Sequence, residues 1–180
     1  FDHQYKGLMT MRQALIESRN VPAIRALAAV GITKAQNFIS QMGFDYDKTL
    51  EYQNGIGLPS STLQNAAAYA AFANGGTYYQ PQYIKEIVTG DGERKEFSSS
   101  GKQVMQSSTA YMITDMLKGV ITSPEGTGTR ANISGLYQAG KTGTNAYPSD
   151  ISAKFPDNAV MDSWFNGYTK HYLSLIHISE

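Results

Sequence analysis

The sequence predicts an α/β fold in which helices come first and strands follow. Two helix-start signals support the helical part: Thr10 with Gln13, and Ser61 with Gln64, each place a hydroxyl at the N-cap and a glutamine three residues later. A hairpin signal, Gly90-Asp91-Gly92 between two strand-forming runs, marks where the strands begin. The 180 residues are 41% apolar, which is enough for one packed core.

The first helix is expected over residues 11–17. Its buried face would carry Met11, Ala14 and Leu15. A second helix restarts at Val21-Pro22, because proline is tolerated in the first turn and its predecessor avoids the α region. Residues 18–20 should therefore form a short, presented turn.

Two more helices are expected before the strands. Ile32-Thr33 with Gln36 predicts a staple and capping box for a helix that runs to Met42 and ends at Gly43. Its apolar stripe would be Phe38, Ile39 and Met42. The helix that begins at Ser61 should continue through the alanine-rich segment 66–73 and end at Asn74-Gly75-Gly76.

The later part of the chain mixes strands with one more helix. Residues 83–89 and 93–97 should pair as the hairpin. Ser107 or Ser108 is expected to cap a helix whose core face carries Met112, Ile113, Met116, Leu117 and Val120. On composition, Gly126-Thr127-Gly128-Thr129 fits a flexible loop, and no Gly-Lys-Ser/Thr follows that would make it a phosphate loop. We interpret Trp164 and Phe165 as sheet packing on a following strand.

Composition excludes several classes of function. Formal net charge is zero, so the chain has no electrostatic footprint for nucleic acid. There are no cysteines, and the three histidines do not have the spacing of zinc ligands. We expect neither a metal nor a cofactor.

Residues 140–144 read Gly-Lys-Thr-Gly-Thr and form a candidate anion site. Lys141 supplies a cation, Thr142 and Thr144 supply O–H donors, and Gly143 lets a ligand approach the backbone without a Cβ in the way. Charge-assisted hydrogen bonds of this kind contribute roughly 1.5 to 3 kcal/mol each. Taken alone, the run fits a turn or an edge-strand kink better than a site.

Ser18 and Asn20 offer a second set of polar groups. A serine hydroxyl can pass a proton, and an asparagine amide can donate to a carbonyl and accept from an N–H. Taken alone, both residues fit an ordinary helix end, where serine and asparagine are favoured.

Together, Ser18-x-Asn20 and Lys141-Thr142-Gly143 match two of the three active-site motifs of penicillin-binding proteins and serine β-lactamases. Residues 10–27 (TMRQALIESRNVPAIRAL), 66–79, 126–144 and 162–169 (DSWFNGYT) also resemble the transpeptidase domain of class A penicillin-binding proteins. The resemblance reaches to about Tyr172. It implies the penicillin-recognising serine transferase fold, an antiparallel sheet beside a mostly helical subdomain. It also implies that residues 126–129 lead into the Lys-Thr-Gly strand and border the cleft.

The resemblance also implies a role for each site residue. Ser18 would relay a proton to the leaving amine, Lys141 would hold the field positive within hydrogen-bond reach of Ser18, and Asn20 would orient the substrate amide. The terminal carboxylate of a D-Ala-D-Ala stem peptide would be bound by Thr142, Gly143 and Thr144. The Thr144 N–H would donate half of an oxyanion hole.

Partners and location follow from the same resemblance. Peptidoglycan stem peptides and β-lactam antibiotics are the expected ligands, and nucleic acid is not. A glycosyltransferase domain is expected upstream, and the protein would act at the extracytoplasmic face of the bacterial cell membrane.

We identify no Ser-x-x-Lys, the third motif of the family with the acylated serine, before Ser18 or elsewhere in the chain. We therefore expect residues 1–172 to be a partial transpeptidase domain, truncated at both ends and inactive without its nucleophile. Residues 173–180 (LSLIHISE) resemble a translated sequencing adapter, and we expect a non-native tail in which His177 has no functional role. The alternation of apolar residues in this segment also fits a strand.

Two other functions fit the motifs. A serine β-lactamase would hydrolyse its acyl-enzyme with a carboxylate-activated water, and Glu51 to Asn54 faintly resembles the corresponding loop, although a solvated glutamate explains it better. A non-catalytic module that senses penicillin or peptidoglycan would keep the binding motifs and lack the nucleophile.

Overall fold

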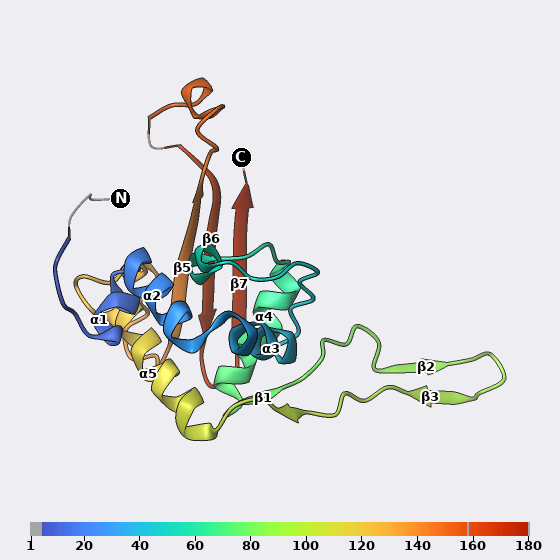
Figure 1. Cartoon of the computed structure of the whole chain (residues 1–180). Helices are drawn as coiled ribbons and strands as arrows, with labels where there is room; N and C mark the ends of the chain where they lie inside the picture. The colour runs from blue at the N-terminus through green and yellow to red at the C-terminus, as the bar shows by residue number, and fades with distance from the viewer. Residues whose placement is uncertain (1–4, 158, 180) are drawn as a thin grey trace.

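The computed structural model describes residues 5–157 and 159–179 (Figure 1). The helices are α1 (Met11–Ile16), α2 (Asn20–Val30), α3 (Ile32–Gln41), α4 (Thr62–Ala73) and α5 (Ser107–Thr122). The strands are β1 (Thr77–Tyr78), β2 (Glu86–Val88), β3 (Arg94–Glu96), β4 (Lys102–Gln103), β5 (Ala139–Ala146), β6 (Val160–Tyr168) and β7 (Leu173–Ser179). Short 3₁₀ turns are η1 (Tyr52–Ile56), η2 (Thr129–Ala131) and η3 (Ser152–Lys154). The predicted α/β class, with helices first and antiparallel strands after, is confirmed.

The main sheet has the order β5-β6-β7, and both strand pairs are antiparallel (Figure 1). In its register Lys141 lies opposite Asn166, and Thr142 lies opposite Phe165. Strand β5 forms an edge of this sheet, so one side of its backbone has no strand neighbour among the described residues. The strand with the Lys-Thr-Gly motif is therefore the edge strand.

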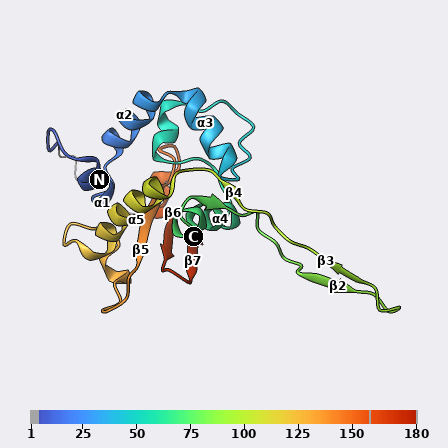
Figure 2. The same cartoon turned by 90° about the horizontal axis from the view of Figure 1, so that it is seen from below.

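Helices α4 and α5 pack beside this sheet (Figure 2). Leu117 and Val120 of α5 form a buried cluster with Ala139 and Tyr168 of the sheet. The Thr114 and Tyr168 hydroxyls lie 2.9 Å apart, so the polar tip of the tyrosine has a partner. This packing fixes the position of β5 relative to α5.

Three local signals are confirmed. Thr10 Oγ1 accepts from the Gln13 N–H at 3.1 Å and begins α1. Ser61 and Gln64 form a complete, reciprocal capping box at α4. Gly43 follows α3 with φ of 85°, a backbone conformation that favours glycine.

Two predicted caps are wrong, because each side chain has a tertiary partner instead. Gln36 does not cap α3; its amide bonds the Lys48 carbonyl and the Leu50 N–H, which holds the loop after the helix. Ser107 donates to the Gly75 carbonyl at 3.0 Å, and no side chain caps α5.

Two predicted core methionines are also wrong. Met11 is 54% exposed and Met112 is 56% exposed, although each lies at a helical spacing that fits a buried face. The buried residues of their helices include Ala14 and Ile16 on α1, and Leu117 and Val120 on α5. In both cases the contact face is rotated away from the methionine.

The predicted hairpin is present as β2 and β3. Figure 1 and Figure 2 show it projecting from the rest of the molecule. Its strands are exposed along their length, and Arg94 pairs with Glu86 at 2.7 Å.

Residues 173–179 form β7, paired with β6 from Tyr168↔Leu173 to Asp162↔Ser179, so the segment has the strand conformation that its alternation allowed. Glu180 lies outside the described residues, as do residues 1–4 of the expected domain. His177 stacks on Trp164 at 4.0 Å. A translated adapter can still pair as a strand, so the adapter hypothesis concerns the origin of this segment and is decided by the nucleotide sequence.

Candidate active site

The turn between α1 and α2 presents Ser18. Helix α2 begins at Asn20, before the predicted restart at Val21-Pro22, and α1 ends at Ile16, so the turn covers residues 17–19 instead of 18–20. Ser18 has φ of 55°, a left-handed conformation that costs an L-residue about 1–2 kcal/mol. The Arg19 N–H donates to the Ala14 carbonyl at 2.8 Å and closes the turn. The strained serine is therefore held between two helices.

Lys141 reaches this turn from the edge strand. Its Nζ donates to Ser18 Oγ at 2.7 Å and to the Thr142 carbonyl oxygen at 2.9 Å. Burial lowers the pKa of Lys141 from 10.5 to about 8, because desolvation disfavours the charged form. Two motifs 123 residues apart thus share one hydrogen bond.

An unsatisfied acceptor lies on the same face of the sheet as Lys141. Asn166, directly opposite Lys141 in the register, is buried, and its Oδ1 has no hydrogen-bond partner among the described residues. Directly opposite residues have their Cβ atoms about 5 Å apart. The residue directly across the sheet from Lys141 is therefore polar and uncharged.

The other predicted residues surround this pair. Thr142 Oγ1 lies 2.6 Å from Thr127 Oγ1, and Thr144 is exposed. A Cβ on Gly143 would lie 3.1 Å from Trp164 Cβ, so a side chain there would crowd the neighbouring strand. Asn20 is exposed, and its side chain makes no hydrogen bond with the rest of the described chain. The structure brings Ser18, Lys141 and Thr142 into one connected group and leaves Asn20 at its margin.

Glu17 organises the turn, and the sequence analysis missed it. Its carboxylate accepts from Lys6 Nζ at 2.7 Å, Gln13 Nε2 at 2.5 Å and Arg19 Nε at 2.8 Å. These bonds hold the pKa of Glu17 at about 2, well below 4.5, with Gln13 as the largest contributor. Because Glu17 and Arg19 flank Ser18, their ion pair bridges the strained residue.

Glu17→Gln should make the stability of the protein less sensitive to acid. With the folded pKa near 2, the native state keeps its carboxylate while the unfolded state takes up a proton, so stability is lost as pH falls from about 4.5 to 2. Thermal unfolding of the full-length protein at pH 3 and pH 6 should differ less in this variant than in wild type. Glu96→Gln, on the exposed hairpin, is the control; an unchanged pH difference in Glu17→Gln would contradict the role of this cluster.

A Ser-x-x-Lys sequence does occur in the chain, at Ser99 and Lys102, and the sequence analysis overlooked it. It follows Ser18 instead of preceding it, and residues 97–101 are not helical. Nearby, Gly101 packs against Tyr79 and Thr77, so this segment belongs to the β1–β4 region and not to the Ser18 turn. The match does not supply the missing nucleophile.

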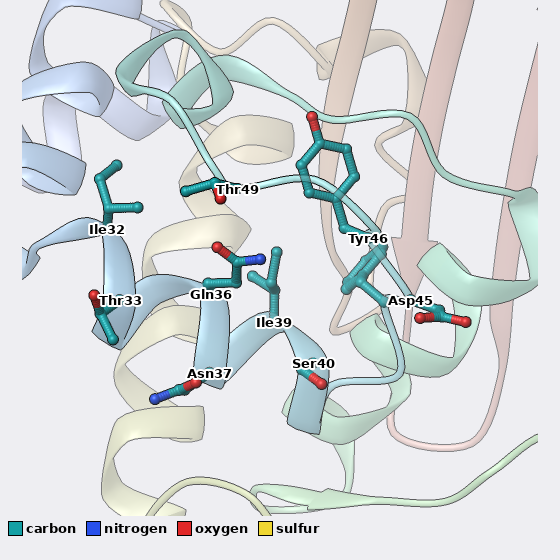
Figure 3. Close-up of a pocket in the computed structure, with 10 residues that line it drawn as sticks. Ile32, Thr33, Gln36, Asn37, Ile39, Ser40, Asp45, Tyr46 and Thr49 are labelled. Carbon is teal, nitrogen blue, oxygen red and sulfur yellow. The ribbon is translucent and has the colours of Figure 1, made fainter.

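A separate depression of about 370 Å³ lies between α3 and the segment that follows it. Figure 3 shows Gln36 and Ile39 extending from α3 toward Tyr46 and Thr49. The amide of Gln36 already bonds the backbone of this segment. None of the residues that line the depression belongs to the Ser18–Lys141 group.

Neither a metal site nor a membrane-crossing helix is found in the described part of the chain. No group of three or more His, Cys, Asp or Glu side chains there could hold a metal ion. Among the same residues, every helix is too short or too polar to cross a bilayer.

Glu51, the residue of the β-lactamase alternative, is exposed and makes local bonds. Its carboxylate accepts from Gln53 Nε2 at 2.7 Å, and its backbone N–H donates to Asn54 Oδ1.

Comparison with known proteins shows the family of this chain. The family model described as "Penicillin binding protein transpeptidase domain" matches residues 1–176. Penicillin-binding protein 1A of Streptococcus pneumoniae is 43% identical over 96% of this chain, which spans 25% of that protein. Penicillin-binding protein 1A/1B of Bacillus subtilis is 38% identical over 98% of the chain and 20% of its own length. The chain thus spans about a quarter of the length of these curated relatives.

Solved structures share the fold. The D,D-transpeptidase domain of a peptidoglycan glycosyltransferase from Eggerthella lenta matches with a TM-score of 0.74 and 25% identity, over 93% of this chain and 46% of that one. Penicillin-binding protein 3 of Mycobacterium tuberculosis, solved with ampicillin, matches with a TM-score of 0.81 and 24% identity over 99% of this chain and 47% of that one. The chain therefore belongs to the transpeptidase-domain family of class A penicillin-binding proteins, which are serine D,D-transpeptidases.

Proposed function

We propose that the protein containing this chain is a peptidoglycan cross-linking D,D-transpeptidase that acts on D-Ala-D-Ala stem peptides and is acylated by β-lactams. The observation that carries the proposal is the 2.7 Å bond from Lys141 Nζ to Ser18 Oγ. It joins the Ser-x-Asn and Lys-Thr-Gly motifs, which are 123 residues apart in the sequence.

The direction of this bond suits a proton relay. An ammonium only donates, so Ser18 Oγ accepts from Lys141 and its own proton is free to point into the site. Ser18 then gives that proton to the leaving amine and takes one from Lys141. The pKa of about 8 for Lys141 favours this role, because general acid catalysis is most efficient when the pKa lies near the working pH.

The edge strand suits an extended peptide substrate. Strand β5 ends the sheet, so a stem peptide can pair with its free side while Thr142 and Thr144 donate to the terminal carboxylate. In this proposal the Thr144 N–H supplies half of the oxyanion hole, and Asn20 contacts substrate from the α2 side.

The nucleophile in this proposal is a serine of a Ser-x-x-Lys motif outside this chain, so that the chain alone does not form an acyl-enzyme. A glycosyltransferase domain in the same protein and a position at the outer face of the cell membrane are part of the same proposal.

Covalent labelling with a fluorescent penicillin tests the function in the full-length protein. A transpeptidase forms a stable adduct that survives denaturation and is blocked by unlabelled penicillin. Reversible binding without an adduct would favour a penicillin or peptidoglycan sensor. Rapid turnover of penicillin that Glu51→Ala abolishes would favour a β-lactamase, although the local bonds of Glu51 count against that role.

A further inference from the structure

The loop that follows α5 is hydrogen-bonded to the C-terminal end of α5 through the residues on either side of Thr127. The Gly126 N–H donates to the Ser123 carbonyl at 2.9 Å, and the Gly128 N–H donates to the Val120 carbonyl at 3.0 Å. A Cβ on Gly126 would lie 2.3 Å from the Val120 carbonyl oxygen, so the loop approaches α5 as closely as a glycine allows. Composition alone fits a flexible loop at residues 126–129, whereas the resemblance implies a segment that borders the cleft. The two backbone bonds anchor the glycines on either side of Thr127.

This docking places Thr127 against the Lys-Thr-Gly strand. Its Oγ1 lies 2.6 Å from Thr142 Oγ1. Phe165, which pairs with Thr142 in the sheet, packs beside the same loop: a Cβ on Gly128 would lie 3.4 Å from its ring. The position of the Thr127 hydroxyl is thus set from α5 and from β6.

We propose that Thr127 is a positioning residue that donates its hydroxyl proton to Thr142 Oγ1 and so directs the Thr142 proton to the carboxylate of the ligand. A carboxylate only accepts, so Thr142 must donate to it, and its oxygen is then free to accept from Thr127. Donation from Thr127 also polarises the Thr142 hydroxyl and strengthens its bond to the anion. The inference rests on the proposed function, since it assigns a carboxylate-bearing ligand to this site.

The test compares benzylpenicillin with its methyl ester in the full-length protein. The two ligands differ in the group that Thr142 would contact, and the preference is the ratio of their dissociation constants before acylation, together with the ratio of their acylation rates. Thr127→Val should lower the preference for the acid about 3- to 10-fold, the effect of one lost hydrogen bond, and leave ester binding unchanged. Thr127→Ser keeps the hydroxyl and should keep the preference.

Two further variants separate positioning from a general structural effect. Thr129→Val removes an exposed hydroxyl from the same loop and should leave the preference unchanged. On a Thr142→Val background, Thr127→Val should have no additional effect, because the residue through which it acts is gone.

The inference is overturned if Thr127→Val keeps the wild-type preference, or if it weakens acid and ester equally. It is supported only by a selective loss on the acid. Absence of acylation in the wild type would refute the transpeptidase proposal separately, because the ratio of dissociation constants still reports on Thr127.

Discussion

Lys141→Ala in the full-length protein should slow acylation by penicillin about 10²- to 10⁴-fold, the range of a lost proton-transfer group. The variant removes the donor to Ser18 Oγ, so the serine loses both its orientation and its source of a proton. The second-order rate of acylation, measured with a fluorescent penicillin at pH 7, reports the effect. Lys85→Ala, on the exposed hairpin, is the matched control and should acylate as wild type does.

Stability should change far less than acylation. Lys141 has a pKa of about 8 in the folded state, whereas a lysine side chain in water has its ordinary pKa of 10.5, so between these values the unfolded state binds more protons. Stability therefore rises as pH increases from about 8 to 10.5, and at neutral pH the buried ammonium is a cost to the native state. Its removal offsets part of the packing lost with the side chain.

The pH dependence of acylation is a second test of the role of Lys141 as the proton donor to Ser18. Wild-type acylation should fall as pH rises through about 8, because Lys141 loses the proton that Ser18 needs. Lys141→Ala should lack this limb. Unchanged acylation in Lys141→Ala, or an unchanged high-pH limb, would reject the role given to Lys141.

Local signals in the sequence predicted the helices and the hairpin well where the partner is a near neighbour. The Ser61–Gln64 capping box and the positive φ of Gly43 depend on atoms within a few residues. Ser107 and Gln36 failed as caps because their partners come from other parts of the chain, 32 residues away for Ser107 and up to 14 for Gln36. A propensity does not specify which distant carbonyl competes for the side chain.

The site residues also fall into those that the sequence predicts and those that only the structure shows. Ser18, Asn20 and the segment 141–144 could be named from motif order alone, because a known family carries these residue types in that order. The roles of Thr127 and Glu17 could not be named in this way. The resemblance placed residues 126–129 beside the cleft but not the contact of Thr127 with Thr142, and Glu17 looks like a surface helix residue. The contact of Thr127 with Thr142 forms only when the loop after α5 is brought against β5. The bonds of Glu17 to Gln13 and Arg19 are local, but they depend on the left-handed turn at Ser18, which no residue type in the sequence signals.

Ser18→Ala and Ser18→Gly should both lose acylation by about 10²- to 10⁴-fold, since either change removes the hydroxyl that bonds Lys141. They should differ in stability, because Ser18 has φ of 55° and only glycine adopts that conformation without strain. Ser18→Gly is expected to be about 1 kcal/mol more stable than Ser18→Ala, and its thermal midpoint correspondingly higher.

This pair of variants separates strain from chemistry at one position. If the left-handed turn alone were important, glycine would restore acylation that alanine loses, since it fits the backbone better than serine does. If the hydroxyl is the proton relay, the more stable variant remains as slow as the less stable one. Penicillin acylation rates and thermal midpoints measured on both full-length variants distinguish these outcomes, and substantial acylation by Ser18→Gly would contradict the relay through Ser18.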